Sequence, residues 1–181
     1  YSSSGMLIDS LLGKLSSGWR GLSYRPAKSG RAFYLLTGTS GMLQLHDKGV
    51  AKTAAIFKAP APGLGGATLN HLEDAAMTGV GDVVFSAKIT GGKVTGARGI
   101  FQYTASDTSL SAIVSEGQPL TADGTTTLKR LHSVHVAASG TVLLRVFIAG
   151  GSFGAGNTGL FRVASGAGLV KVIAAGDQLE I

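Results

Sequence analysis

A unit of about sixty residues occurs more than once in this chain, and it limits the possible folds more than any other feature. The tripeptide Gly99–Phe101 returns sixty residues later as Gly159–Phe161. Upstream of it, Gly81–Phe85 aligns in the same way with Gly140–Leu144. Since each unit of a repeat protein buries its apolar faces only against a neighbouring unit, the chain is predicted to consist of similar supersecondary elements packed in series.

Further matches define three copies of the unit. Gly91-Gly92 aligns with Gly150-Gly151, and Gly117–Leu120 aligns with Gly176–Leu179. A weaker copy opens the chain, and its matching segments are Gly30–Tyr34, Gly41–Gln44, Ala54–Ile56 and Pro60–Gly63. The predicted organisation is a single repeat domain over 1–181, with units at about 1–63, 64–120 and 121–181.

The composition favours strands over helices. The chain of 181 residues contains 28 glycines, 44% hydrophobic residues and only 14% charged residues. Many short strands joined by tight turns have such a composition, whereas a helical protein is richer in Glu, Lys and Leu. The absence of cysteine excludes disulfides, thiolate metal sites and cysteine nucleophiles. The fold class predicted from these data is all-β.

Each unit contains four strand signals in the same order, separated by turns rich in Gly, Asp and Ser. The strands predicted in the middle unit are 68–77, 82–90, 99–105 and 109–116. Those in the last unit are 127–137, 141–149, 159–164 and 168–175, and those in the first are 19–27, 31–37, 41–46 and 51–58. A helix is also predicted over 10–17, although Gly13 weakens it.

Alternation along two of these strands predicts which faces are buried. The residues that share one face are Val83, Phe85, Ala87 and Ile89 in one strand, and Val142, Leu144, Val146 and Ile148 in the other. The opposite faces are not uniformly polar, because they carry Val84 and Ser86 in one strand and Leu143 and Phe147 in the other. Both faces of these strands are therefore expected to be covered by neighbouring sheets.

Four antiparallel strands at a fixed interval, with both sheet faces covered, describe the blade of a β-propeller. The predicted fold is three four-stranded antiparallel propeller-like blades, arranged as a partial β-propeller or as stacked small sheets. Gly81–Ala87, Gly91–Phe101 and Ile113–Leu120 resemble a repeat of similar length in bacterial secreted proteins that often carry a C-terminal sorting anchor. The resemblance covers 65–181 well and 19–63 poorly. It implies a propeller-like fold, a secreted or cell-surface location in a bacterium, and no assigned biochemical role.

Three blades leave two open flanks, because closed propellers have about four to eight blades. Exposed apolar faces of this kind mark interaction sites, so the chain is expected to self-associate into a homo-oligomer or polymer. The predicted function is a non-catalytic extracellular module, structural or adhesive, that associates through these flanks. The alternative is a carbohydrate-binding or carbohydrate-active β-propeller, either a lectin or a glycoside hydrolase.

The net charge of +6 lies entirely in the first unit. Residues 1–60 hold eight basic and two acidic residues, whereas residues 61–181 hold eight of each. The basic residues are scattered singly, so nucleic-acid binding is not expected. An anionic polysaccharide or the cell envelope is a better-suited partner for this charge. No stretch reaches the roughly 18 consecutive apolar residues of a membrane-spanning helix, so no membrane span is expected.

Several local patterns invite sharper interpretations, and each has a structural alternative. Gly151–Thr158 has the glycine spacing of a phosphate-binding loop, but Asn157 stands where its lysine is required. His132 and His135 are spaced like metal ligands, yet residues three apart in a strand point to opposite faces. The remaining histidines, His46 and His71, are isolated in the sequence. No metal, cofactor or catalytic residue is therefore predicted, and the protein is not expected to be an enzyme.

Carboxylates and aromatic residues are the candidates for binding or hydrolysing a carbohydrate. Glu73, Asp74 and Glu116 are the acids from which a pair for glycoside chemistry would be drawn. Adjacent acids in a strand diverge, however, and Glu116 aligns with Ala175, so no second unit repeats this role. The candidates for sugar-stacking platforms are Trp19, Tyr24, Tyr34 and Tyr103, with core packing as the alternative.

Overall fold

The computed structural model describes residues 22–26, 31–36, 41–47, 50–92, 96–120, 126–137, 141–150, 158–164 and 168–175. These residues form three four-stranded antiparallel sheets, and each sheet pairs its strands in chain order. The first sheet consists of β1 (Leu22–Pro26), β2 (Arg31–Leu36), β3 (Met42–Asp47) and β4 (Val50–Ile56). The second consists of β5 (Thr68–Met77), β6 (Val83–Thr90), β7 (Arg98–Thr104) and β8 (Ser109–Ser115). The third consists of β9 (Thr126–Val136), β10 (Val142–Gly150), β11 (Thr158–Ala164) and β12 (Gly168–Ala174).

The all-β class and the three groups of four strands are confirmed. Every predicted strand is present, and its ends lie within three residues of the predicted ends. The helix predicted over 10–17 lies outside the described residues. Among the residues that the structure describes, no sheet pairs its first strand with its last, and the three sheets do not form a closed propeller.

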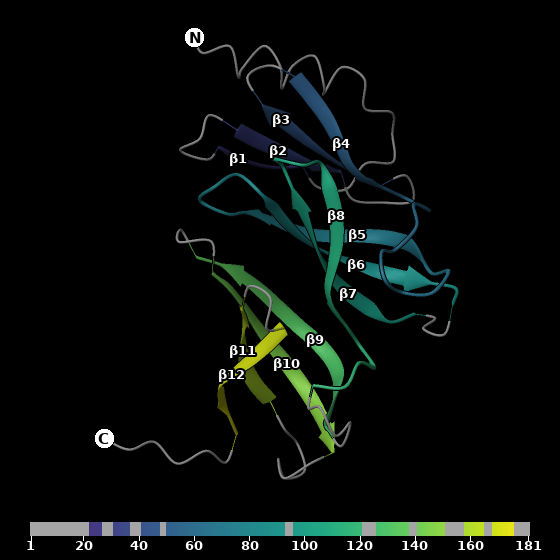
Figure 1. The fold of residues 1–181 in the computed structure, drawn as a ribbon, viewed down its shortest axis with the longest axis vertical. Coiled ribbons are helices and arrows are strands. Elements are labelled where there is room, and N and C mark those ends of the chain that lie inside the picture. The colour runs from purple at the N-terminus through teal and green to yellow at the C-terminus, as the bar shows by residue number, and fades with distance from the viewer. Residues whose placement is uncertain are drawn as a thin grey trace.

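The three sheets follow one another along the long axis of the molecule, with the second sheet between the other two (Figure 1). One core lies between the first and second sheets, where Leu43 belongs to the same buried cluster as Phe85. A second core lies between the second and third sheets, where Val84 belongs to the same cluster as Leu144. Successive residues of β6 thus enter different cores, and each of the residues 83–87 is at most 8% exposed.

The expectation that both strand faces are covered is confirmed for β6 and holds only in part for β10. In β10, Val142 and Leu144 belong to the core shared with the second sheet. On the opposite face, Leu143 and Phe147 are half-buried and Arg145 is exposed. The third sheet therefore has one face in the core and one face that is largely open.

A β-bulge occurs at the same place in every sheet, where the third strand pairs with the fourth. The extra residue is Ala54 in β4, Ile113 in β8 and Val172 in β12. These residues are 59 positions apart in both steps. Because a bulge bends and twists its strand, the three sheets share a local distortion as well as a topology. The weak sequence match of the first unit thus corresponds to a true structural repeat.

The segments that leave the first and second sheets each pair with the first strand of the following sheet. After the first sheet, the amide of Lys58 donates a hydrogen bond to the carbonyl of Leu69 in β5 at 2.7 Å. After the second sheet, the amide of Gly117 donates to the carbonyl of Leu128 in β9 at 2.7 Å. These linkers cover part of an edge that would otherwise present unpaired backbone groups.

Lys58 and Gly117 hold the same place in these linkers but differ in backbone strain. Both have a left-handed backbone, with φ of 66° and 86°. Lys58→Gly is expected to raise the free energy of unfolding by about 0.5–1 kcal/mol, because the strain of a left-handed lysine exceeds the entropy that glycine adds to the unfolded chain. Urea unfolding measures this change.

The reciprocal change, Gly117→Lys, is the control for this prediction. A Cβ atom on Gly117 meets nothing within 4 Å, so the variant isolates the backbone effect. It is expected to lower the free energy of unfolding by about 1 kcal/mol. Shifts of the same sign in both variants would contradict the assignment of strain to this position.

Candidate functional site

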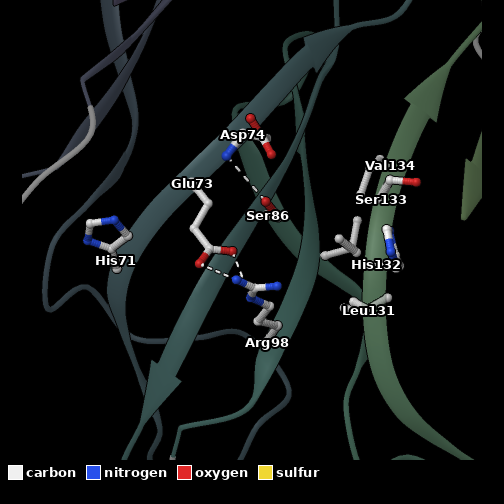
Figure 2. Close-up of a pocket in the computed structure, with 10 residues that line it drawn as sticks. His71, Glu73, Asp74, Ser86, Arg98, Leu131, His132, Ser133 and Val134 are labelled. Atoms are coloured by element: carbon white, nitrogen blue, oxygen red, sulfur yellow. Dashed lines mark hydrogen bonds and ion pairs between the residues drawn. The ribbon is translucent and has the colours of Figure 1, made fainter. Parts of the chain in front are cut away.

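A cleft of about 430 Å³ opens between the second and third sheets, where β5 and β9 face each other (Figure 2). The second sheet contributes His71, Glu73, Asp74, Ser86, Arg98 and Ile100, and the third sheet contributes Leu131, His132, Ser133 and Val134. Most of these side chains are charged or can form hydrogen bonds. The cleft thus differs in chemistry from the two apolar cores, and it is the candidate functional site of the described part of the chain.

Two equivalent β-bulges place polar residues along this cleft. In β5, Glu73 and Asp74 together oppose Ser86 on β6. In β9, His132 and Ser133 occupy the same place 59 residues later. The amide of Asp74 donates a hydrogen bond to the hydroxyl oxygen of Ser86 at 3.2 Å, which satisfies a donor that the bulge removes from the regular ladder. The bulges therefore explain both the position and the polarity of the cleft.

Glu73 and Arg98 form a two-point ion pair on the wall of the cleft. The Nε atom of Arg98 lies 3.0 Å from Oε2 of Glu73, and its Nη2 atom donates to Oε1 at 3.1 Å. Two parallel bonds of this kind fix the orientation of both side chains. Figure 2 shows Glu73 turned toward Arg98 and Asp74 turned away from it. The prediction that the adjacent acids diverge is confirmed.

Glu116 connects the same arginine to the third sheet. Its Oε2 atom accepts a hydrogen bond from the backbone amide of Arg98 at 2.9 Å, and its Oε1 atom accepts one from the amide of Leu131 at 2.8 Å. The amide of Glu116 in turn donates to the carbonyl of Arg98 at 2.8 Å. In this arrangement the carboxylates of Glu73 and Glu116 both serve contacts within the protein. Asp74 is the acid in the cleft that these contacts leave exposed.

A second hollow of about 390 Å³ shares Asp74, His132 and Ser133 with the cleft. His135 lines this hollow together with His132. The prediction that these histidines point to opposite faces is wrong, because the bulge at His132 shifts the alternation of β9 by one residue. Within the described residues, no group of three or more His, Cys, Asp or Glu side chains is placed to hold a metal ion.

The other candidates from the sequence lie elsewhere. Tyr103 is 4% exposed and belongs to the core between the first and second sheets, so its ring serves packing. Burial raises the pKa of its hydroxyl above the ordinary value. The structure does not describe Trp19, the segment 151–157, or the side chains of Tyr24, Tyr34 and His46.

Sequence reasoning identified the acids of the cleft but missed Arg98 and Ser86. The signal for Arg98 lies in the departures of the middle unit from the repeat. Arg98 aligns with Thr158, and Glu73 aligns with His132. The middle unit therefore carries a basic and an acidic residue at two positions where the last unit carries neither. Such paired departures indicate a contact between the two residues. For Ser86 the sequence gives no comparable signal, because its role depends on the bulge opposite it.

The sequence profile of a protein family described as "Family of unknown function (DUF7453)" matches residues 33–181. The matched range begins within β2 and includes parts of all three sheets. No curated protein and no solved structure matches the chain. In the described part of the chain, no helix has both the length and the apolar character needed to cross a membrane.

Proposed function

We propose a function for this chain, which belongs to the family of unknown function DUF7453, from the open face of its third sheet. The chain is a non-catalytic structural or adhesive module at the outside of a bacterial cell. Its copies associate through the open faces of their outermost sheets, and each sheet acts as a propeller-like blade. The support comes from one comparison between equivalent residues of the three sheets.

One pair of residues, joined across the third and fourth strands, occupies the same place in every sheet. The pairs are Leu43 with Ala55, Ile100 with Val114, and Leu160 with Ile173. The first two pairs lie in the cores between sheets, and none of their four side chains is more than 4% exposed. Leu160 and Ile173 are apolar and no smaller than the residues they correspond to, yet they are only half-buried. The third sheet thus carries on its open face the residues that the other sheets use for stacking.

The surroundings of this pair are also apolar. Leu160 and Ile173 line a shallow hollow of about 340 Å³ on the third sheet. On the neighbouring edge strand β12, Val170 is 37% exposed and Val172 is 51% exposed. At the other end of the molecule, Ile56 on β4 is 47% exposed. Exposed apolar side chains of this kind favour contact with a partner over contact with water.

A contact between the third sheet of one copy and the first sheet of another joins two different surfaces and is therefore heterologous. Such a contact forms a closed ring if the rotation between copies closes, and a filament if it does not. Two copies supply six sheets, a number within the range of about four to eight blades in known propellers. We propose the ring of two copies as the basic assembly.

Ile173→Glu is expected to weaken this association by roughly a hundredfold, because a carboxylate buried without a partner costs about 3 kcal/mol. Light scattering over a concentration series measures the change, and circular dichroism checks that the variant keeps its strands. Val80→Glu is the matched control, since Val80 is 68% exposed in the turn between β5 and β6. A wild-type protein that stays monomeric at every concentration, or an equal loss in both variants, would refute the proposal.

The positive charge of the first unit favours a second kind of partner for the assembled module. Its excess positive charge suits an anionic polysaccharide or another anionic component of the cell envelope. Retention on an immobilised anionic polysaccharide is expected to fall steeply with added salt. Retention that does not depend on salt would exclude this electrostatic contact.

The polar cleft favours a second function, the binding of a sugar or another small polar ligand. Hydroxyl, imidazole, carboxylate and guanidinium groups from two sheets line the cleft, and such groups can fix the orientation of a polar ligand. A glycan array tests this function, with Arg98→Met as the variant and Arg145→Met, in the exposed part of β10, as its control. Binding that both variants retain would place the ligand outside the cleft.

A further inference from the structure

The third sheet is strongly basic. Its strands carry Lys129, Arg130, Arg145, Arg162 and Lys171, whereas residues 124–176 contain no Asp or Glu. The neutral sum of residues 61–181 hides this charge. Residues 61–120 hold three basic and five acidic residues, and residues 121–181 hold five basic and three acidic residues. The surface of the third sheet therefore attracts anions even though this part of the sequence is neutral as a whole.

Three of the basic residues lie on the open face of the third sheet. Arg145 shares this face with Leu143 and Phe147 of β10, and directly opposite residues of antiparallel strands point to the same side. Arg130 of β9 is opposite Phe147, and Arg162 of β11 is opposite Leu143. All three arginines are exposed.

The three arginines form a diagonal line across β9, β10 and β11, which we call the arginine row. Arg130 and Arg162 are the diagonal neighbours of Arg145, one on each side. Diagonal neighbours on one face of a sheet are about 7–8 Å apart, within reach of long side chains. Within the described residues, none of the three forms an ion pair with a carboxylate. The row is therefore positive charge without an internal partner.

The row is difficult to see in the sequence, because its members are 15 and 17 residues apart. Only the pairing of the three strands brings them together. The single basic residues that argue against a charged surface in the sequence thus form one in the fold.

The chemistry of the row suits a polymer with repeated carboxylate groups. A guanidinium group binds a carboxylate through two parallel hydrogen bonds. One small anion cannot contact three groups spread over three strands, whereas a polymer can place successive carboxylates along them. The half-buried side chains of Phe147 and Leu160 beside the row offer apolar surface to sugar rings.

A single-stranded nucleic acid fits this face less well. Its binding surfaces stack successive bases on several aromatic side chains. Among the described residues, Phe147 is the one Phe, Tyr or Trp side chain on the open face of the third sheet.

We infer that the arginine row binds an acidic polysaccharide through its carboxylate groups. This inference goes beyond the proposed function, because it requires neither self-association nor the charge of the first unit. It also bears on the contact between copies, since the first unit is basic as well. A polymer on the row counters the repulsion between the third sheet of one copy and the first sheet of the next.

Arg145→Gln tests the row, and Lys88→Gln is its matched control. Lys88 is exposed on β6 of the second sheet, and each substitution removes one positive charge. The probe is polygalacturonate, which has one carboxylate on every sugar, and isothermal titration calorimetry at low salt measures its dissociation constant. The constant is expected to rise about fivefold in Arg145→Gln and less than about twofold in Lys88→Gln.

Replacement of both ends of the row, Arg130→Gln together with Arg162→Gln, is expected to raise the dissociation constant about 25-fold. Circular dichroism checks that the variants keep their strands. On the glycan array, Arg145→Met is then expected to lose acidic glycans, so it serves as the control for the cleft with neutral sugars.

Several outcomes would overturn the inference. Unchanged affinity in Arg145→Gln would assign the polymer to the first unit alone, and an equal loss in Lys88→Gln would show that only net charge matters. Displacement of the polymer by the same concentration of monomeric galacturonate would indicate a site for a single anion. Tighter binding of single-stranded DNA at the same concentration of charge would indicate a nucleic acid as the partner.

The outcome for self-association is separate. A selective loss in Arg145→Gln, on a protein that light scattering shows to be monomeric, would support the arginine row while it refutes the proposed assembly. Association of the wild type without any binding of polygalacturonate would have the opposite meaning.

Discussion

Phe101→Ala is expected to lower the free energy of unfolding by about 4 kcal/mol, the largest loss among the substitutions considered for this protein. Phe101 is fully buried, and it pairs across strands with Phe85 on β6. The two rings are stacked, with their centroids 5.5 Å apart and their planes 25° apart. Alanine therefore loses both the transfer free energy of the ring and its contacts with Phe85. Because native proteins are stable by only about 5–15 kcal/mol, this variant is expected to be partly unfolded at moderate urea concentrations.

The control for this variant is Phe147→Ala on the open face of the third sheet. Phe147 is half-buried, and its ring lies 5.9 Å from that of His132. Its truncation is expected to cost only about 1 kcal/mol, because solvent already reaches the ring. Equal losses for Phe101 and Phe147 would show that the core between the first and second sheets does not dominate stability.

The ring of Phe101 also explains why residue 99 is a glycine. A Cβ atom on Gly99 would lie 2.8 Å from Cδ1 of Ile89 and 2.9 Å from Cε2 of Phe101. Gly99→Ala is therefore expected to destabilise the wild type by about 2 kcal/mol through overpacking. The loss is expected to be smaller by about 1 kcal/mol in the presence of Phe101→Ala, since the ring that creates the clash is gone. Strictly additive losses would contradict this coupling.

The tripeptide that reveals the repeat in the sequence is thus a packing requirement. In the third sheet, a Cβ atom on Gly159 would lie 2.6 Å from Cε2 of Phe161, an even closer approach than the one at Gly99. The phenylalanine folds back over the glycine of its own strand in both sheets. The spacing of these two residues is readable from the sequence alone, and so are the strands that contain them, because turns and alternation depend on local residues.

The bulges of β5 and β9 were not predictable in the same way. Glu73 and Asp74 follow the alternating pattern of an ordinary strand in the sequence, yet together they oppose Ser86. The same irregularity at His132 brings it to the same hollow as His135. A bulge depends on pairing with a neighbouring strand, which a periodic pattern in one strand does not encode. The polar cleft, which lies between two bulges, therefore emerged only from the structure.

The contacts between sheets were predictable in outline but not in detail. Apolar residues on both faces of β6 indicated that neighbours cover this strand, and Val84 and Phe85 do enter different cores. The hydrogen bond between the carboxylate of Glu116 and the amide of Leu131 had no counterpart in the repeat, because Ala175 occupies the position of Glu116 in the last unit. A contact that occurs once cannot be recognised from internal repetition. The contact made by Glu116 is nevertheless the polar contact with the largest predicted effect on stability.

Glu116→Ala is expected to lower the free energy of unfolding by about 3 kcal/mol, because two backbone amides lose a charged acceptor at once. The amide of Arg98 lies in the second sheet and the amide of Leu131 in the third, and the carboxylate binds them at 2.9 and 2.8 Å. Glu116→Gln keeps one acceptor oxygen, so its expected loss is about half as large. Urea unfolding measures both losses, and amide hydrogen exchange is expected to accelerate at Arg98 and Leu131.

Asp107→Ala is the matched control for the loss of a carboxylate that binds backbone. Asp107 accepts hydrogen bonds from the amide and hydroxyl of Ser109 at 3.0 and 2.7 Å, within an exposed turn of the second sheet. These bonds hold the pKa of Asp107 below its ordinary value, but they join residues only two apart and link no sheets. The control is expected to change the free energy of unfolding by less than about 0.5 kcal/mol. If Glu116→Ala changes stability as little as this control, the stacking of the second and third sheets depends on their apolar core alone, and the carboxylate bridge merely accompanies it.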